Sequence, residues 1–266
     1  WVNSTYADDQ GNAFYMDTSS APNLSPDSMR VLMAKYYGSA AFKALFDNQL
    51  TLLDGSSSRD DWVRGQCDSL VPYSGRPQLL RSDFVQNSND SYWATNPASP
   101  VEGYSPMFGL ERTAQGPRTR IGTYMLQNPT VAGYGETSPA GQDGKFSADD
   151  IAAVLHNNRT WYSEQFLPEL RTRCAAIGAG TVNVPGGTPR SVASACSVLA
   201  SWNGRYDLDS VGAHVYRVFI ADYAGKFATE LTVPFNPNDP VGTPSTPRPM
   251  DPANLDDDPM LVSLAV

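Results

Sequence analysis

The sequence has 266 residues, of which 41% are hydrophobic and 18% charged, so the chain can bury a core and is not disordered by composition. Its 28 acidic residues outnumber its 19 basic ones, and the net charge of -9 argues against nucleic acid as a partner, because phosphate binding needs clustered Lys and Arg. No apolar run approaches the roughly 20 residues of a membrane-spanning helix. We therefore expect neither a nucleic-acid nor a membrane partner.

The first part of the chain carries signals for a hairpin and two helices. Aromatic and β-branched residues fill 1–7 and 12–17, and the turn residues between them predict a β-hairpin. Pro26 then opens a helix whose apolar residues recur at spacings of three and four, and a short helix is expected at 40–46.

The stretch that follows is polar up to a short apolar segment at 80–86. Residues 54–80 are rich in turn formers and predict irregular surface structure. A strand is expected at 80–86, which leads straight into an asparagine-rich segment at 87–91. Pro117 is placed to open a helix that runs to about residue 126.

From Ser147 onward the pattern is mostly helical. Ser147 is a good N-cap for a helix whose apolar stripe consists of Ile151, Val154 and Leu155. Further helices are expected at 163–177, 191–201 and 210–226, the last capped by Asp209 or Ser210. The eight prolines of 234–259 predict an extended linker or a segment that wraps over the surface.

These patterns predict an α+β fold with a hairpin at the start and a mostly helical second half. We expect a sheet-rich part at 1–130, a helical part at 131–233, and a Pro-rich linker and tail at 234–266. Because the chain starts without Met and stops on an apolar run, we expect a processed or partial polypeptide.

Cys174 and Cys196 lie in two expected helices on either side of a Gly/Pro-rich loop. That layout favours a disulfide that clamps a helix–loop–helix in an oxidising compartment, and hence a secreted or periplasmic protein; the alternative is two small buried thiols. Cys67 is left over. With only His156 and His214, both in expected helices, a zinc site is not expected. Motifs of serine hydrolases, phosphate-binding loops and zinc proteases are absent from the sequence.

Several segments, in chain order, resemble the β chain of penicillin acylases. Residues 1–15 match its YAD-x-x-GN hairpin, 84–93 its asparagine-rich segment at the oxyanion hole, 112–113 with 118–121 its arginine helix, and 195–204 its L-x-x-W-[DN]-G helix end. The branch most similar to this chain acts on acyl-homoserine lactones and on lipopeptides such as aculeacin A. The specificity of the resemblance comes from the ordered set.

The resemblance implies part of a four-layer αββα N-terminal-nucleophile hydrolase. In that family, autocatalytic processing of a zymogen exposes a serine that attacks an amide carbonyl while its own α-amino group acts as base. The matching hairpin lies well inside the family's β chain, so the nucleophile is expected on another segment, and this chain alone is expected to be inactive. Its expected partners are the remaining α and β segments of the same precursor.

The implied substrate is a small acyl amide: an acyl-homoserine lactone, a lipopeptide or a β-lactam antibiotic. Such an activity would serve quorum quenching or antibiotic metabolism. No cofactor is expected; the family sometimes binds a structural calcium ion, whose ligands cannot be assigned here. The rival hypothesis is a non-catalytic secreted domain for binding or structure.

The resemblance also implies site residues. Asn89 is the candidate oxyanion-hole donor, with Asn87 if the register slips by two, and Arg118 is the candidate orienting residue, with Arg120 as the alternative. Ala13 matches a position that lines the acyl pocket. The alternative for the asparagines is a plain Asx-turn, and for the arginines a solvated helix face.

Overall fold

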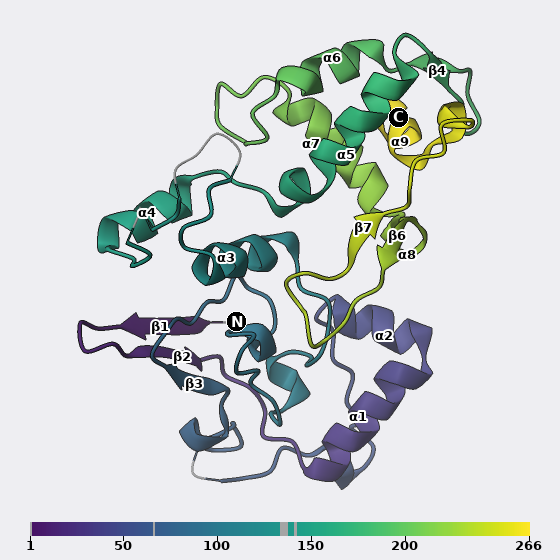
Figure 1. Ribbon diagram of the computed structural model, residues 1–266. Coiled ribbons are helices and arrows are strands. Elements are labelled where there is room, and N and C mark those ends of the chain that lie inside the picture. The colour runs from purple at the N-terminus through teal and green to yellow at the C-terminus, as the bar shows by residue number, and fades with distance from the viewer. Residues whose placement is uncertain (1, 66, 134–137, 141–142) are drawn as a thin grey trace. The chain divides into compact units, whose positions relative to one another are not determined.

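The computed structural model describes residues 2–65, 67–133, 138–140 and 143–266 (Figure 1). The chain divides into two compact units, Trp1–Thr113 and Ala114–Val266. Residues 114–130, which the sequence grouped with the sheet-rich part, lie in the second unit. Mixed helices and small antiparallel sheets agree with the α+β class.

The first unit begins with the predicted hairpin, of which Trp1 lies outside the described residues. Asp8 closes its turn, because Oδ1 accepts the N–H groups of Gln10 at 3.0 Å and Asn12 at 2.9 Å. Gly11 has a φ of 86°, which a glycine adopts without strain. The sheet has the order β1-β2-β3 and is antiparallel throughout, with β1 at Asn3–Ala7, β2 at Ala13–Asp17 and β3 at Gln78–Arg81 (Figure 1).

The strand expected at 80–86 is therefore wrong in its bounds. Arg81 donates from Nε and Nη2 to the two carboxylate oxygens of Asp83, at 2.8 and 2.7 Å. Asp83 Oδ1 in turn accepts the N–H of Phe84 at 2.8 Å. These bonds turn the backbone away from the sheet directly after β3, so the chain continues as a loop.

The two predicted helices of this unit are confirmed as α1 (Pro26–Gly38) and α2 (Ala40–Asp47). Ser25 caps α1 by accepting the N–H of Ser28 at 3.0 Å. Most of the irregular region expected at 54–80 is confirmed, and β3 begins only at its end. Short 3₁₀ turns occupy Ser58–Asp60, Tyr73–Gly75, Tyr92–Ala94 and Pro106–Phe108.

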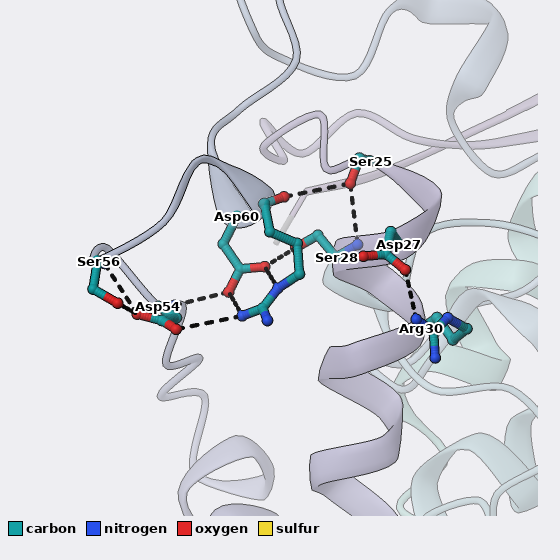
Figure 2. Close-up of polar contacts among 8 residues, drawn as sticks. Ser25, Asp27, Ser28, Arg30, Asp54, Ser56 and Asp60 are labelled. Carbon is teal, nitrogen blue, oxygen red and sulfur yellow. Dashed lines mark hydrogen bonds and ion pairs between the residues drawn. The ribbon is translucent and has the colours of Figure 1, made fainter.

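Asp60 ties the loop at 54–60 to the start of α1, as Figure 2 shows. Its carboxylate accepts hydrogen bonds from the Ser28 hydroxyl at 2.7 Å and from the backbone N–H of Asp54 at 2.8 Å. Arg59 donates to both carboxylate oxygens at 3.0 Å. These donors, Arg59 first, hold the pKa of Asp60 well below its usual range.

Several helices of the second unit share a core, and Ile121, Met125 and Trp161 form a second buried cluster. The largest cluster of buried apolar residues in this unit includes Leu167, Leu199, Tyr216 and Leu261, each fully buried. The helices are α3 (Pro117–Gln127), α4 (Ala148–His156), α5 (Trp161–Ile177), α6 (Ala193–Ser201), α7 (Ala213–Ala224), α8 (Phe227–Glu230) and α9 (Pro259–Ala265). Two short ribbons pair β4 (Thr181–Val182) with β5 (Arg190–Ser191), and β6 (Leu231–Val233) with β7 (Ser245–Pro247).

Local signals in the sequence predicted where α4 begins, but not which of its apolar residues are covered. Ser147 and Asp150 form the capping box that starts the helix. Of the expected apolar stripe, only Val154 packs against a buried cluster, whereas Ile151 is 48% and Leu155 is 77% exposed. Within the described residues, the expected stripe is therefore only partly covered.

The predicted cap of the helix at 210–226 is also wrong. Helix α7 begins after Gly212, which has a φ of 114°, and no side chain caps it. Ser210 is engaged elsewhere, because its hydroxyl donates to Asn203 Oδ1 at 2.6 Å and accepts the indole N–H of Trp202 at 3.0 Å.

The Pro-rich segment is only partly a linker. It contributes β7 to a ribbon and a 3₁₀ turn at Leu255–Asp257. Residues 259–265, expected as a tail, form α9, in which Met260 is 1% exposed and Leu261 0%. Asp258 starts this helix by accepting the N–H groups of both residues. Among the described residues, no helix has the length and apolar character to span a membrane.

Candidate functional site

The asparagine-rich segment lies at the tip of a loop whose base is closed by Asn96. The Asn96 side chain is fully buried, and its Nδ2 donates to the carbonyl of Phe84 at 2.9 Å and to Asp83 Oδ1 at 3.1 Å. Its Oδ1 accepts the N–H of Ala98 at 2.9 Å. The backbone N–H of Gln86 donates to the Thr95 carbonyl at 3.0 Å, so both sides of the base are joined.

The tip, residues 87–90, is a tight turn that treats its two asparagines differently. Asn89 has a φ of 62°, a left-handed conformation that Asn tolerates better than most residues, and it is exposed. Its backbone N–H donates to Asn87 Oδ1 at 2.8 Å. Asn87 Nδ2 donates to the Asp90 carbonyl at 3.0 Å. Both ends of the Asn87 amide are thus used inside the turn.

Ala13 is the first residue of β2, the middle strand of the sheet of the first unit. It pairs with Ala7 of β1 and Arg81 of β3 and is 8% exposed. Since side chains two apart on a strand share a face, Ala13 shares its face with Tyr15, which is fully buried. The Tyr15 hydroxyl donates to Asn3 Oδ1 at 2.7 Å, and burial raises the pKa of this phenol.

The two candidate arginines stand two residues apart on α3 and therefore on different sides of it. Arg120 is 4% exposed, and its guanidinium donates to the carbonyls of Val241 at 2.7 Å and Pro244 at 3.0 Å. It also lies 4.5 Å from the centre of the Trp161 ring. Burial lowers the pKa of Arg120 to about 10.

Arg118, by contrast, is exposed at the start of α3. Arg118 and Arg120 belong to the second unit, and Asn87 and Asn89 belong to the first.

The predicted disulfide is present. Cys174 of α5 and Cys196 of α6 are bonded with their Cα atoms 5.5 Å apart, and Cys67 is an exposed free thiol. Across the part of the chain that the structure describes, no group of three or more His, Cys, Asp or Glu side chains is arranged to hold a metal ion.

Glu111 and Asn96, which form hydrogen bonds next to the 87–90 turn, were not predicted as functional residues. The Tyr92 hydroxyl donates to Glu111 Oε1 at 2.6 Å, and Asn96 closes the base of the loop. Glu111 directly precedes the matched residues 112–113, so a signal was present beside it. Asn96 precedes a proline and carried no signal beyond that of a turn.

Comparison with known proteins gives a consistent result. A family model described as penicillin amidase matches residues 1–259. Acyl-homoserine lactone acylase PvdQ of Pseudomonas syringae pv. syringae (strain B728a) is 34% identical over 248 residues, which are 92% of this chain and 28% of that protein. Aculeacin-A acylase of Actinoplanes utahensis is 33% identical over 251 residues, which are 92% of this chain and 30% of that protein.

The chain thus spans less than a third of the length of these two relatives. The match nevertheless extends over almost all of its own residues, including the turn at 87–90 and helix α3. The resemblance inferred from the sequence is confirmed, and the chain belongs to the penicillin amidase family.

Proposed function

We propose that this chain is part of an acylase that hydrolyses the amide between an acyl chain and an amine-bearing head group. The family match and the similarity to both an acyl-homoserine lactone acylase and aculeacin-A acylase support this class of reaction. The substrate classes that follow are acyl-homoserine lactones, acylated lipopeptides and β-lactams with an acyl side chain. The Cys174–Cys196 disulfide supports a working place outside the cytoplasm, in the periplasm or outside the cell.

The chemistry requires a nucleophile that we assign to another segment of the same precursor. An N-terminal serine there would attack the amide carbonyl, its α-amino group would take the hydroxyl proton, and the amine would leave with that proton. Water would then hydrolyse the acyl-serine ester by the same route. In both steps negative charge develops on the former carbonyl oxygen, and the contribution of this chain is to stabilise that charge.

Asn89 is the donor that we assign to this oxyanion, and the turn geometry is the observation that carries the choice. The Asn87 amide already accepts from Asn89 and donates to Asp90. Using Asn87 as the donor would break the turn that holds it. Asn89 is exposed at the tip of the same turn, on a backbone fixed by Asn87. A donor fixed before the reaction stabilises a developing charge without reorganisation.

The orienting arginine is, in this proposal, Arg118. The guanidinium of Arg120 is buried against two carbonyls and an indole ring, so it serves to hold the chain at 241–244. Arg118 is exposed at the start of α3, and we assign the orienting role to it. Ala13 is proposed to line the acyl pocket, where its single methyl group leaves room for a long chain.

The test uses the complete acylase, matured from the precursor that contains this chain. We would measure release of free amine from acyl-homoserine lactones of several chain lengths, an acylated lipopeptide and penicillin G. The expected effect of Asn89→Ala is a loss of about 10²–10³-fold in kcat with KM little changed, because the contact strengthens only in the transition state. Both chains of the mature enzyme must be present in the assay.

Asn87→Ala is the internal control and is expected to have the milder effect. A mature Asn89→Ala enzyme with full kcat, next to an inactive Asn87→Ala enzyme, would shift the assignment by two residues. If the intact enzyme hydrolysed none of these amides, the non-catalytic alternative would replace the acylase proposal.

A further inference from the structure

Tyr92, the residue that follows the 87–91 segment, donates to a carboxylate oxygen that accepts two further hydrogen bonds. Tyr92 is 1% exposed, and its hydroxyl donates to Glu111 Oε1 at 2.6 Å. The same oxygen accepts the backbone N–H groups of Gly103 at 2.8 Å and Tyr104 at 3.2 Å. The Tyr104 ring packs edge-on against the Tyr92 ring, with centres 5.6 Å apart. We call residues 103–111 the buttress of the turn.

A carboxylate is well suited to hold a buried phenol. Burial, followed by the hydrogen bond to Glu111 and then the charge of Glu111, raises the pKa of Tyr92, so its hydroxyl keeps its proton and remains a donor at every working pH. A hydrogen bond to a charged acceptor is also shorter and stronger than one between neutral groups. The position of the Tyr92 ring is therefore fixed by Glu111.

The buttress touches the turn at a second point. Gly109 has a φ of 141°, and a Cβ at this residue would lie 2.9 Å from Ser91 Oγ and 3.3 Å from Ser91 Cα. Only a residue without a side chain lets the two backbones approach this closely. Ser91 and Tyr92, the two residues directly after the 87–90 turn, thus both rest on the buttress.

The residues that follow Tyr92 in the chain belong to the base of the loop. Thr95 Oγ1 donates to the Tyr92 carbonyl at 2.7 Å, and the N–H of Val101 donates to the Trp93 carbonyl at 2.9 Å. The turn that carries Asn89 therefore stands between a closed base and the buttress. A shift of Tyr92 is transmitted directly to the turn through Ser91.

We propose that Glu111 is a positioning residue for the oxyanion donor: it touches no substrate, but by holding Tyr92 it sets where the Asn89 amide points. This inference rests on the proposed function of Asn89. An oxyanion donor acts at about 2.7–3.1 Å from the charged oxygen. A displacement of about 1 Å can reduce the rate about 10²-fold.

The first experiment removes the hydroxyl of Tyr92 in the complete, matured enzyme. Tyr92→Phe is expected to lower kcat about 10-fold and to leave KM within about 2-fold, since only the transition-state contact is disturbed. Glu111→Gln keeps one acceptor oxygen and is expected to give a smaller decrease in kcat, whereas Glu111→Ala gives at least the effect of Tyr92→Phe. Glu102→Gln is the matched control, because Glu102 bonds to the exposed Arg112 and is expected to leave kcat unchanged.

The second experiment separates positioning from general stability. In an Asn89→Ala background, Tyr92→Phe should lower kcat no further, because there is no longer an amide to position. All rates are divided by the concentration of active sites, found by titration, and the midpoint of thermal unfolding is measured for each variant.

The outcomes distinguish the two proposals. If Asn89→Ala retains full kcat, the oxyanion assignment fails and the role of Glu111 falls with it. The oxyanion assignment stands and the positioning role is overturned in two cases, both with an impaired Asn89→Ala enzyme. In the first, Tyr92→Phe leaves kcat unchanged. In the second, the decrease in kcat caused by Tyr92→Phe multiplies the decrease caused by Asn89→Ala. Failure of both Tyr92→Phe and Glu111→Gln to mature, while Asn89→Ala matures, would also overturn the positioning role in favour of a purely structural contact.

Discussion

The guanidinium of Arg173 and the carboxylate of Asp258 form an ion pair inside the second unit. Their Nε and Oδ2 atoms are 2.8 Å apart, and the side chains are 3% and 5% exposed. Arg173 comes from α5, and Asp258 is the N-cap of α9. The pair therefore fastens the last helix to the centre of the unit, and Glu169 contributes a second carboxylate to Arg173.

Asp258→Asn should destabilise the second unit by about 3 kcal/mol, near the lower limit for breaking a buried ion pair, because Glu169 still contacts Arg173. The measurement is the denaturant midpoint of unfolding, with exposed Asp251→Asn as control. Equal midpoints for the two variants would contradict the importance of this pair.

Of the two arginines of α3, we expect Arg120 to contribute to stability and Arg118 to contribute to the reaction rate. Arg120→Ala removes two hydrogen bonds to carbonyls and the contact with Trp161, and we expect a loss of about 2–3 kcal/mol of stability. Arg118→Ala is at an exposed position and should change stability by less than about 0.5 kcal/mol while lowering kcat. Thermal unfolding and steady-state kinetics of the matured enzyme test both, and the reverse pattern would favour Arg120 as the orienting residue.

Because Cys174 and Cys196 are bonded to each other, we expect a definite number of free thiols in the unreduced chain. The unreduced, denatured chain should report one free thiol, that of Cys67. Replacing Cys174 and Cys196 by Ser should cost about 3 kcal/mol, since the bond closes a loop with a sequence separation of 22. A titration that finds three thiols would exclude the bond.

Stability should fall in acid partly through Asp60. Its pKa is lowered in the folded state, so its contribution is complete above the unfolded value of about 3.9 and is lost as the pH falls toward the folded value. The midpoint of thermal unfolding should therefore decrease below about pH 5, and less steeply in Asp60→Asn. Asp61→Asn, at the exposed neighbour, is the control and should keep the wild-type slope.

Features set by neighbouring residues were predictable from the sequence. Ser25 before Pro26, and Ser147 three residues before Asp150, are complete cap signals in themselves, and α1 and α4 begin where they indicate. The hairpin and the pairing of Cys174 with Cys196 were also predicted.

Features that depend on contacts with other parts of the chain were not predictable from the sequence. The end of β3 depends on Asp83, whose carboxylate also accepts from Asn96, and the start of α7 follows from the engagement of Ser210 with Trp202 and Asn203. A periodic pattern shows that Ile151 and Leu155 share a face of α4, but it does not show what covers them. For the site, the family resemblance indicated Asn89 and Arg118, whereas the roles of Glu111 and Asn96 next to the 87–90 turn follow from hydrogen bonds within the first unit.

The burial of α9 has a consequence for biosynthesis. Helices α5, α6 and α7 leave the ribosome well before α9, which supplies Met260 and Leu261 to the same core. A nascent chain at this stage exposes the apolar surfaces that α9 will cover, and it holds Arg173 without Asp258. The contacts of the first unit, among them Tyr92 with Glu111, are complete much earlier in translation. The 87–90 turn can therefore form while the core of the second unit is still incomplete.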